Sequence, residues 1–180
     1  MKTIKIELYK FSELSEKSQQ YAIDTNYTIN VDYEWWKFVY EDMKTVFLKC
    51  SEFDTDRGSK CILTFMESAE NTAHLIEDNH SESCDTYVEA KDYLSKRGLL
   101  INDAPKDENG DFESEYDLDN DLDSLDLEFL HNLQECYLIM LKKEYEYLIS
   151  KESIKESIIC NEYDFTIGGE IYYKTNHNEP

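Results

Sequence analysis

The sequence has few of the features on which common catalytic sites depend. It contains only five glycines in 180 residues, which argues against a phosphate cradle or a nucleotide site, because such loops need glycine where the backbone approaches a phosphate. No nucleophile elbow, HExxH pair or catalytic Cys–His arrangement is recognisable. We therefore expect a protein that is not an enzyme and has no cofactor. An enzyme or metal-dependent module is the least favoured of three functional hypotheses.

Cysteine is present, but its spacing does not resemble a disulfide framework or a zinc site. The five cysteines are an odd number and include no Cys-x-x-Cys pair, so we expect reduced, partly buried thiols. His74, His80 and Cys84 lie close together in the sequence, yet nothing fixes a fourth ligand. We interpret them as loop residues and expect no metal.

Long apolar runs and a leader segment are also missing. No stretch of about 18 apolar residues occurs. The first ten residues, MKTIKIELYK, alternate like a strand and do not form a basic segment followed by an apolar one. We therefore expect a cytoplasmic protein, without a membrane partner.

Negative charge is concentrated in one part of the chain. The formal net charge is −22, and residues 107–141 contain twelve carboxylates with no lysine or arginine. A salt-adapted protein spreads carboxylates over every face, so this concentration favours a local function. The bland alternative is a solvated linker or helix face. Direct nucleic-acid binding is disfavoured, because its affinity comes from lysine and arginine and the chain has only two arginines.

Hydrophobic content and periodicity predict one α+β domain over residues 1–180, with four to five helices and a small antiparallel sheet. The sheet would combine an N-terminal strand (4–8), a central strand (61–66) and a C-terminal hairpin (163–173) turning at Gly168-Gly169. The expected helices cover about 15–26, 33–48, 87–97, 121–149 and 150–160, the third ending at Gly98. Loops are expected at 67–84, in a flexible acidic insertion at about 102–120, and in a frayed tail from Lys174.

The acidic segment invites a calcium interpretation that its sequence does not support. Asp117, Asp119, Asp121, Asp123 and Glu128 match five ligand positions of an EF-hand loop, but Leu122 stands where the sharp turn needs glycine. We expect no specific calcium site.

Carboxylate spacing in the same segment is similar to phosphate spacing in nucleic acid. Duplex DNA advances about 3.4 Å per phosphate along each strand. Alternate aspartates of an extended chain lie about 6.8 Å apart, and Asp119 and Asp123 on a helix differ by about 6 Å of rise. Either geometry matches two phosphate steps. The expected partner-binding carboxylates are Asp111, Glu113, Glu115, Asp117, Asp119, Asp121, Asp123, Asp126 and Glu128.

Trp35 and Trp36 are added to the expected binding residues. Two adjacent tryptophans cannot both face inward along a helix, and exposed tryptophan is a common interaction anchor. We therefore expect one of the two rings to be available to a partner, although core packing is the commoner role of such an aromatic row.

Three segments resemble a family of small acidic proteins of phages and mobile elements that are often labelled antitoxin-like. They are FSELSEKSQQYAIDTN, DYEWWKFVYEDMKTV and LKKEYEYLISKESIKESIICNEYDFTIGGEIYY, at the two ends of the chain, while residues 50–120 match nothing. In size, acidity and lysine-rich composition the chain is also similar in character to anti-CRISPR proteins that inhibit Cas9. The resemblance implies no catalytic residues.

These observations lead to two binding hypotheses. The first is a phage-encoded, DNA-mimicking inhibitor whose acidic segment occupies the basic channel of a CRISPR effector nuclease, with or without its guide RNA. The alternative is an antitoxin that neutralises a basic toxin through the same charge and the tryptophan patch.

Overall fold

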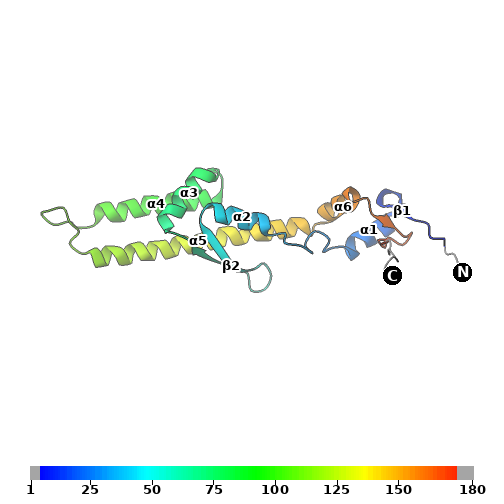
Figure 1. The fold of residues 1–180 in the computed structure, drawn as a ribbon, viewed down its shortest axis with the longest axis horizontal. Helices are drawn as coiled ribbons and strands as arrows, with labels where there is room; N and C mark the ends of the chain where they lie inside the picture. Colours follow the sequence, from blue (N-terminus) through cyan, green and yellow to red (C-terminus); the bar gives the residue numbers. More distant parts are fainter. Residues whose placement is uncertain (1–4, 174–180) are drawn as a thin grey trace, which may run out of the picture. The chain divides into compact units, whose positions relative to one another are not determined.

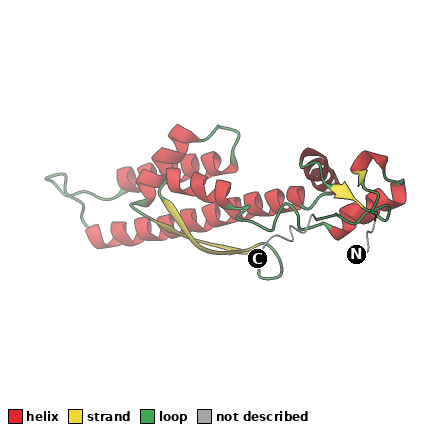
Figure 2. Ribbon diagram, turned by 45° about the vertical axis from the view of Figure 1, so that its right-hand side comes forward, coloured by secondary structure: helices red, strands yellow, loops and turns green. Residues whose placement is uncertain are grey.

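The computed structural model describes residues 5–173, except the side chains of residues 115 and 116 (Figure 1 and Figure 2). Contacts divide the chain into two compact units. Unit 1 comprises Met1–Trp35 with Glu144–Pro180, and unit 2 comprises Trp36–Lys143. Helix α5, Glu115–Leu148, contributes residues to both. The expectation of one domain over 1–180 stays a prediction.

Unit 1 joins both ends of the chain around one hydrophobic cluster. Strand β1 (Tyr9–Lys10) pairs antiparallel with β4 (Asp164–Phe165), and helices α1 (Glu16–Thr25) and α6 (Lys151–Cys160) complete the unit. Ser15 and Ser150 cap these helices by accepting a hydrogen bond from the backbone N–H three residues later. The buried cluster contains Phe11, Leu14, Ala22, Ile154, Ile158 and Phe165.

The C-terminal turn of unit 1 depends on its second glycine. Gly169 has φ +93°, and a Cβ at this position would collide with the backbone carbonyl of Ser18. The Ser18 hydroxyl donates to the carbonyl of Ile167 at 2.8 Å. The turn is therefore packed directly on the start of α1.

Several predictions for unit 1 are confirmed and one is displaced. Helices were expected at 15–26 and 150–160, and α1 and α6 lie there. The N-terminal strand begins at Tyr9, residues 5–8 form no strand, and Ile4 lies outside the described residues, as does the tail from Lys174. The C-terminal hairpin is reduced to a bridge between Phe165 and Ile171, because β4 pairs mainly with β1.

Unit 2 packs a β-hairpin and helices on the part of α5 that ends at Lys143. Its elements are α2 (Lys37–Thr45), β2 (Leu48–Asp54), β3 (Lys60–Phe65), α3 (Ala69–Asn79) and α4 (Asp85–Asp103). β2 and β3 pair antiparallel with a register shift between Cys50 and Glu52. Phe129 of α5 stacks on Tyr93 of α4 and on Phe65 of β3, with ring centroids 4.4 and 6.0 Å apart. These rings form the centre of the unit.

The α+β class is confirmed, but the layout differs from the prediction. The described residues contain six α-helices and two separate two-stranded sheets, so the central strand β3 does not join the terminal strands. The helix expected at 33–48 covers only Lys37–Thr45, because Phe47 adopts φ +58° and ends it. The loop expected at 67–84 contains α3, and the helix expected to stop at Gly98 continues to Asp103.

Candidate functional site

Helices α4 and α5 run side by side and antiparallel in unit 2 (Figure 1). The amide of Asn132 donates to Glu89 at 2.7 Å, and the hydroxyl of Tyr93 donates to Asp126 at 2.6 Å. A salt bridge between Lys96 and Glu128, at 2.9 Å, is the next contact between the two helices. Toward the connecting loop, the two helices line an open groove instead of a filled interface.

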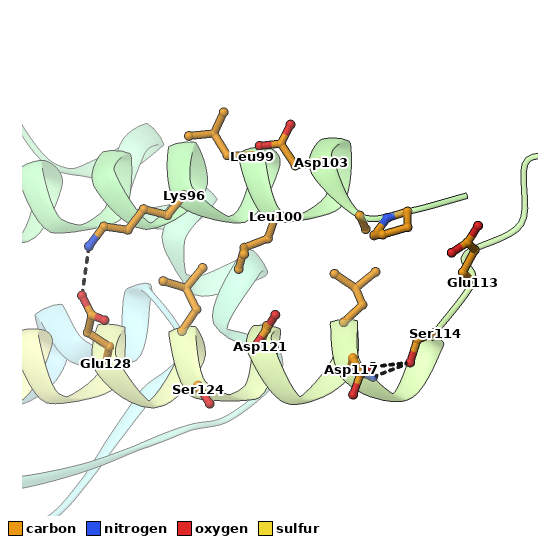
Figure 3. A pocket seen from close by; sticks show the side chains of 14 residues that line it. Lys96, Leu99, Leu100, Asp103, Glu113, Ser114, Asp117, Asp121, Ser124 and Glu128 are labelled. Atoms are coloured by element: carbon orange, nitrogen blue, oxygen red, sulfur yellow. Dashed lines mark hydrogen bonds and ion pairs between the residues drawn. The ribbon is translucent and has the colours of Figure 1, made fainter. Parts of the chain in front are cut away.

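The groove has a volume of about 880 Å³ and combines an apolar floor with an acidic rim. Leu100 and Asp121 point toward the facing helix, and Lys96 reaches Glu128 (Figure 3). The lining leucines are Leu99, Leu100, Leu118 and Leu125, and the lining carboxylates are Asp103, Glu113, Asp117, Asp121 and Glu128. Lys96 is the one lysine or arginine among the described lining residues. The site is thus anionic and amphipathic at once.

Local hydrogen bonds order the loop that connects α4 and α5. The carboxylate of Asp107 accepts the backbone N–H groups of Asn109 at 2.8 Å and Asp111 at 2.9 Å, and these bonds lower the pKa of Asp107. The backbone N–H of Glu113 donates to the carbonyl of Pro105 at 2.9 Å. The segment expected as a flexible insertion therefore contains the end of α4, a bonded turn and the start of α5; its flexibility stays a prediction.

The first turn of α5 is capped by a reciprocal contact. The Ser114 hydroxyl donates to the carboxylate of Asp117 at 2.7 Å and accepts the Asp117 backbone N–H at 3.3 Å. A carboxylate in the first turn also interacts favourably with the helix dipole. Asp117 therefore helps to start the helix as well as lining the groove.

The predicted carboxylates divide between two sides of α5. Asp117 and Asp121, four residues apart, share the groove side with Glu128. At 3.6 residues per turn, Asp119 and Asp123 lie about 160° around the helix from Asp121. The extended geometry considered for this segment is wrong, because all four aspartates belong to α5. They do not form a single row.

Three other predicted carboxylates have separate positions. Asp126 is half-buried and accepts the hydrogen bond from Tyr93. Asp111 is exposed in the loop, with its backbone N–H bonded to Asp107. The side chain of Glu115 lies outside the described residues.

Neither tryptophan is among the lining residues of the groove, and the two belong to different units. Trp35 contacts Tyr145 at a ring-centroid distance of 5.4 Å in unit 1, and Trp36 contacts Phe53 at 5.7 Å in unit 2. Both side chains are half-buried. The most exposed nearby aromatic is Phe38, at 80%. A partner-binding role for the tryptophans stays a prediction.

The described part of the chain contains no candidate metal cluster and no helix able to cross a membrane. No group of three His, Cys, Asp or Glu side chains there is placed to hold a metal ion. The residues of the calcium register form a helix and cannot wrap around an ion as a loop does. Within residues 5–173, no helix combines the length and apolarity needed to cross a bilayer.

Comparisons with protein-family models, curated proteins and solved structures give no match. The resemblance of the chain ends to antitoxin-like phage proteins stays a prediction. The functional interpretation therefore depends on the chemistry of the groove.

Sequence reasoning found one wall of the groove and missed the other. Lys96, Leu99, Leu100 and Asp103 belong to the last two turns of α4, beyond or near the glycine expected to end it. A signal was present, since Leu100 follows Tyr93 by seven residues and continues its helical row. Gly98 has open space around it and does not interrupt the helix.

Proposed function

We propose that this protein is a non-catalytic inhibitor that binds a cationic surface of another macromolecule through the groove between α4 and α5. The observation that carries the proposal is the set of five carboxylates around one apolar floor. Lys96, the one lysine or arginine among the described lining residues, pairs with only one of the five, Glu128, and with Asp92 outside the lining, at 2.9 Å each. These bonds raise the pKa of Lys96 and keep it charged within that cluster.

Two placements of charge lower the stability of the protein itself and so favour a binding role. Asp103 is in the last turn of α4, where no basic residue is present and where a carboxylate opposes the helix dipole by about 0.3–1 kcal/mol. Asp117 and Asp121, both in the groove lining, form a like-charge pair four residues apart, which costs about 0.2–0.5 kcal/mol in a helix. A helix pair with only a structural role would be more stable without these two placements of charge.

The partner we propose is a basic, nucleic-acid-binding nuclease of the host, of the CRISPR effector class represented by Cas9. Asp117 and Asp121 differ by about 6 Å of helix rise, close to two phosphate steps of a DNA strand. Electrostatic attraction would steer the acidic groove toward a channel that normally holds DNA, and the affinity would fall as salt rises. The resemblance of the chain ends to phage proteins supports this partner class.

An antitoxin that neutralises a basic toxin is the second candidate. The feature that favours it is the leucine floor, since apolar side chains suit a protein segment and contribute nothing to imitation of phosphates. Both candidates require a cationic protein partner and differ in its identity.

The test compares two triple variants with the same change of formal charge. The groove variant is Asp103→Asn, Glu113→Gln and Asp121→Asn; the control is Asp78→Asn, Glu82→Gln and Glu135→Gln, which are exposed in unit 2 and do not line the groove. We expect the groove variant to lose at least about tenfold in affinity for a Cas9–guide RNA complex and in inhibition of DNA cleavage, whereas the control keeps both.

The same variants also separate the two candidates. Wild-type protein is used to capture partners from host lysate, and each captured protein is identified by mass spectrometry and retested with both variants. Capture of a toxin in place of a nuclease, with the same dependence on the groove, would favour the antitoxin. Equal behaviour of the groove and control variants toward every partner would reject the groove as the binding site.

A further inference from the structure

We infer that the segment of the partner that fills the groove is a cationic amphipathic α-helix. This inference rests on the proposed function and specifies the chemistry of the ligand. Three properties of the lining support it. The walls are two helices that lie side by side, the floor has apolar residues at helical spacing, and both walls contribute carboxylates.

The helical walls favour a helical ligand over an extended one. Backbone N–H and C=O groups in the middle of α4 and α5 are already bonded within their own helices, so they cannot pair with the backbone of an extended peptide. An extended chain buried on the leucine floor would leave its own backbone groups without partners, which is strongly unfavourable. A helix satisfies its backbone internally and can pack its side chains between those of the two walls.

The floor sets the pattern of apolar residues on that ligand. Leu118 and Leu125 are seven residues apart on α5, and Leu100 faces them from α4. On α5 the lining extends from Asp117 to Glu128, about 16 Å at 1.5 Å per residue, or three helical turns. A ligand helix that repeats leucine or a similar residue at i, i+3 or i+4, and i+7 would cover this length.

The rim sets the charge of the ligand. Asp103 lies on the α4 wall, Asp117 and Asp121 on the α5 wall, and Glu113 in the connecting loop. A helix between the walls would therefore meet carboxylates on both sides of its apolar stripe. Lysine or arginine on those two sides would match them, while an acidic helix or a bare phosphate chain would be repelled.

Synthetic peptides test this inference with the full-length protein. The first peptide is a lysine–leucine helix of about four turns with leucine at i, i+4, i+7 and i+11. The second has the same composition in an order that gives no apolar stripe. Affinity is measured by fluorescence anisotropy and helix formation by circular dichroism. We expect the amphipathic peptide to bind at least about tenfold more tightly and to gain helix on binding.

Two leucine variants locate the binding. Leu100 lines the groove, is half-buried and points toward α5 (Figure 3), and Leu127 is 68% exposed on α5 and is not a lining residue. Leu100→Gln should weaken binding of the amphipathic peptide about fivefold, and Leu127→Gln should leave it unchanged. Thermal unfolding checks that both variants remain folded.

The outcomes distinguish this inference from the function on which it rests. Equal affinity for the two peptides, equal effects of the two leucine variants, or no peptide binding would overturn the helical ligand. If the triple groove variant nevertheless loses its nuclease or toxin partner, the proposed function stands and the groove recognises charge alone. If the groove variant keeps its partner, both proposals fail.

Discussion

The hydroxyl of Tyr93 on α4 donates a 2.6 Å hydrogen bond to the carboxylate of Asp126 on α5, beside the stacked rings of Tyr93 and Phe129. Tyr93 is 2% exposed, so this bond joins the two helices inside the unit, next to the inner end of the groove. Asp126 therefore helps to hold α4 and α5 together and is not among the carboxylates that line the groove. Only some of the carboxylates of the acidic segment line the groove.

Replacing Tyr93 by phenylalanine removes the hydrogen bond and keeps the ring stacking. Asp126 is then left half-buried without its donor, and we expect the free energy of unfolding to fall by about 1–3 kcal/mol. Urea denaturation measures this change. Tyr87→Phe on the same helix is the control, because Tyr87 is less buried, and it should stay within about 0.5 kcal/mol of wild type. Equal losses in the two variants would contradict a structural role for the bond.

Alkaline pH should destabilise the protein partly through Tyr93. Burial and then the bond to Asp126 raise the pKa of Tyr93 well above its ordinary value. Above pH of about 10, the unfolded phenol has lost its proton while the folded one keeps it, so stability falls as pH rises. We expect urea denaturation to show this decline in wild type and a shallower one in Tyr93→Phe. Parallel declines would show that other groups, such as Tyr137, account for it.

Elements with strong hydrophobic repeats were predictable from sequence. One row of a long helix was expected to contain Leu122, Leu125, Phe129, Leu133, Cys136 and Met140. On α5 the middle four are buried, and Leu122 and Met140 are half-buried. The last helix was expected to begin at Ser150 or Ser153, and Ser150 is its N-cap. In these cases, one face of the helix differs sharply in hydrophobicity from the other, so the sequence pattern reflects burial directly.

Other elements lack such a contrast. The buried face of α3 consists of Ala69, Thr72, Ala73 and Ile76, mostly small residues that give a weak helical pattern. Strand β2 follows Phe47, whose positive φ no sequence pattern announced. The groove depends on the pairing of α4 with α5, a tertiary arrangement that links residues far apart in the chain. The acidic residues of α5 were therefore predicted as a binding surface, whereas the contribution of α4, including Asp103, was missed.

Asp103→Asn should stabilise the protein while weakening its binding. The substitution removes a carboxylate from the last turn of α4, and we expect a gain of about 0.3–1 kcal/mol in the free energy of unfolding. It also removes one anion from the groove wall, so affinity for the amphipathic lysine–leucine peptide should fall by about twofold to fivefold. Urea denaturation and anisotropy measure the two effects. Glu82→Gln, exposed and outside the groove lining, should change neither quantity appreciably; a stability gain with unchanged affinity would remove Asp103 from the binding wall.

Thiol labelling at neutral pH should distinguish the exposed cysteine from the buried ones. Cys160 is exposed at the end of α6, whereas Cys136 is buried on α5, and burial raises the pKa of Cys136 to about 11. Because the thiolate is the reactive species, Cys136 should react orders of magnitude more slowly than an accessible thiol. Mass spectrometry of alkylated protein should show Cys160 modified well before the buried Cys61 and Cys136, with the half-buried Cys50 and Cys84 between these limits, and Cys160→Ser should abolish the fast modification of α6. A fast modification at Cys136 in the folded protein would mean that α5 separates readily from its packing partners, and the groove between α4 and α5 would then lack the rigid wall on which its selectivity depends.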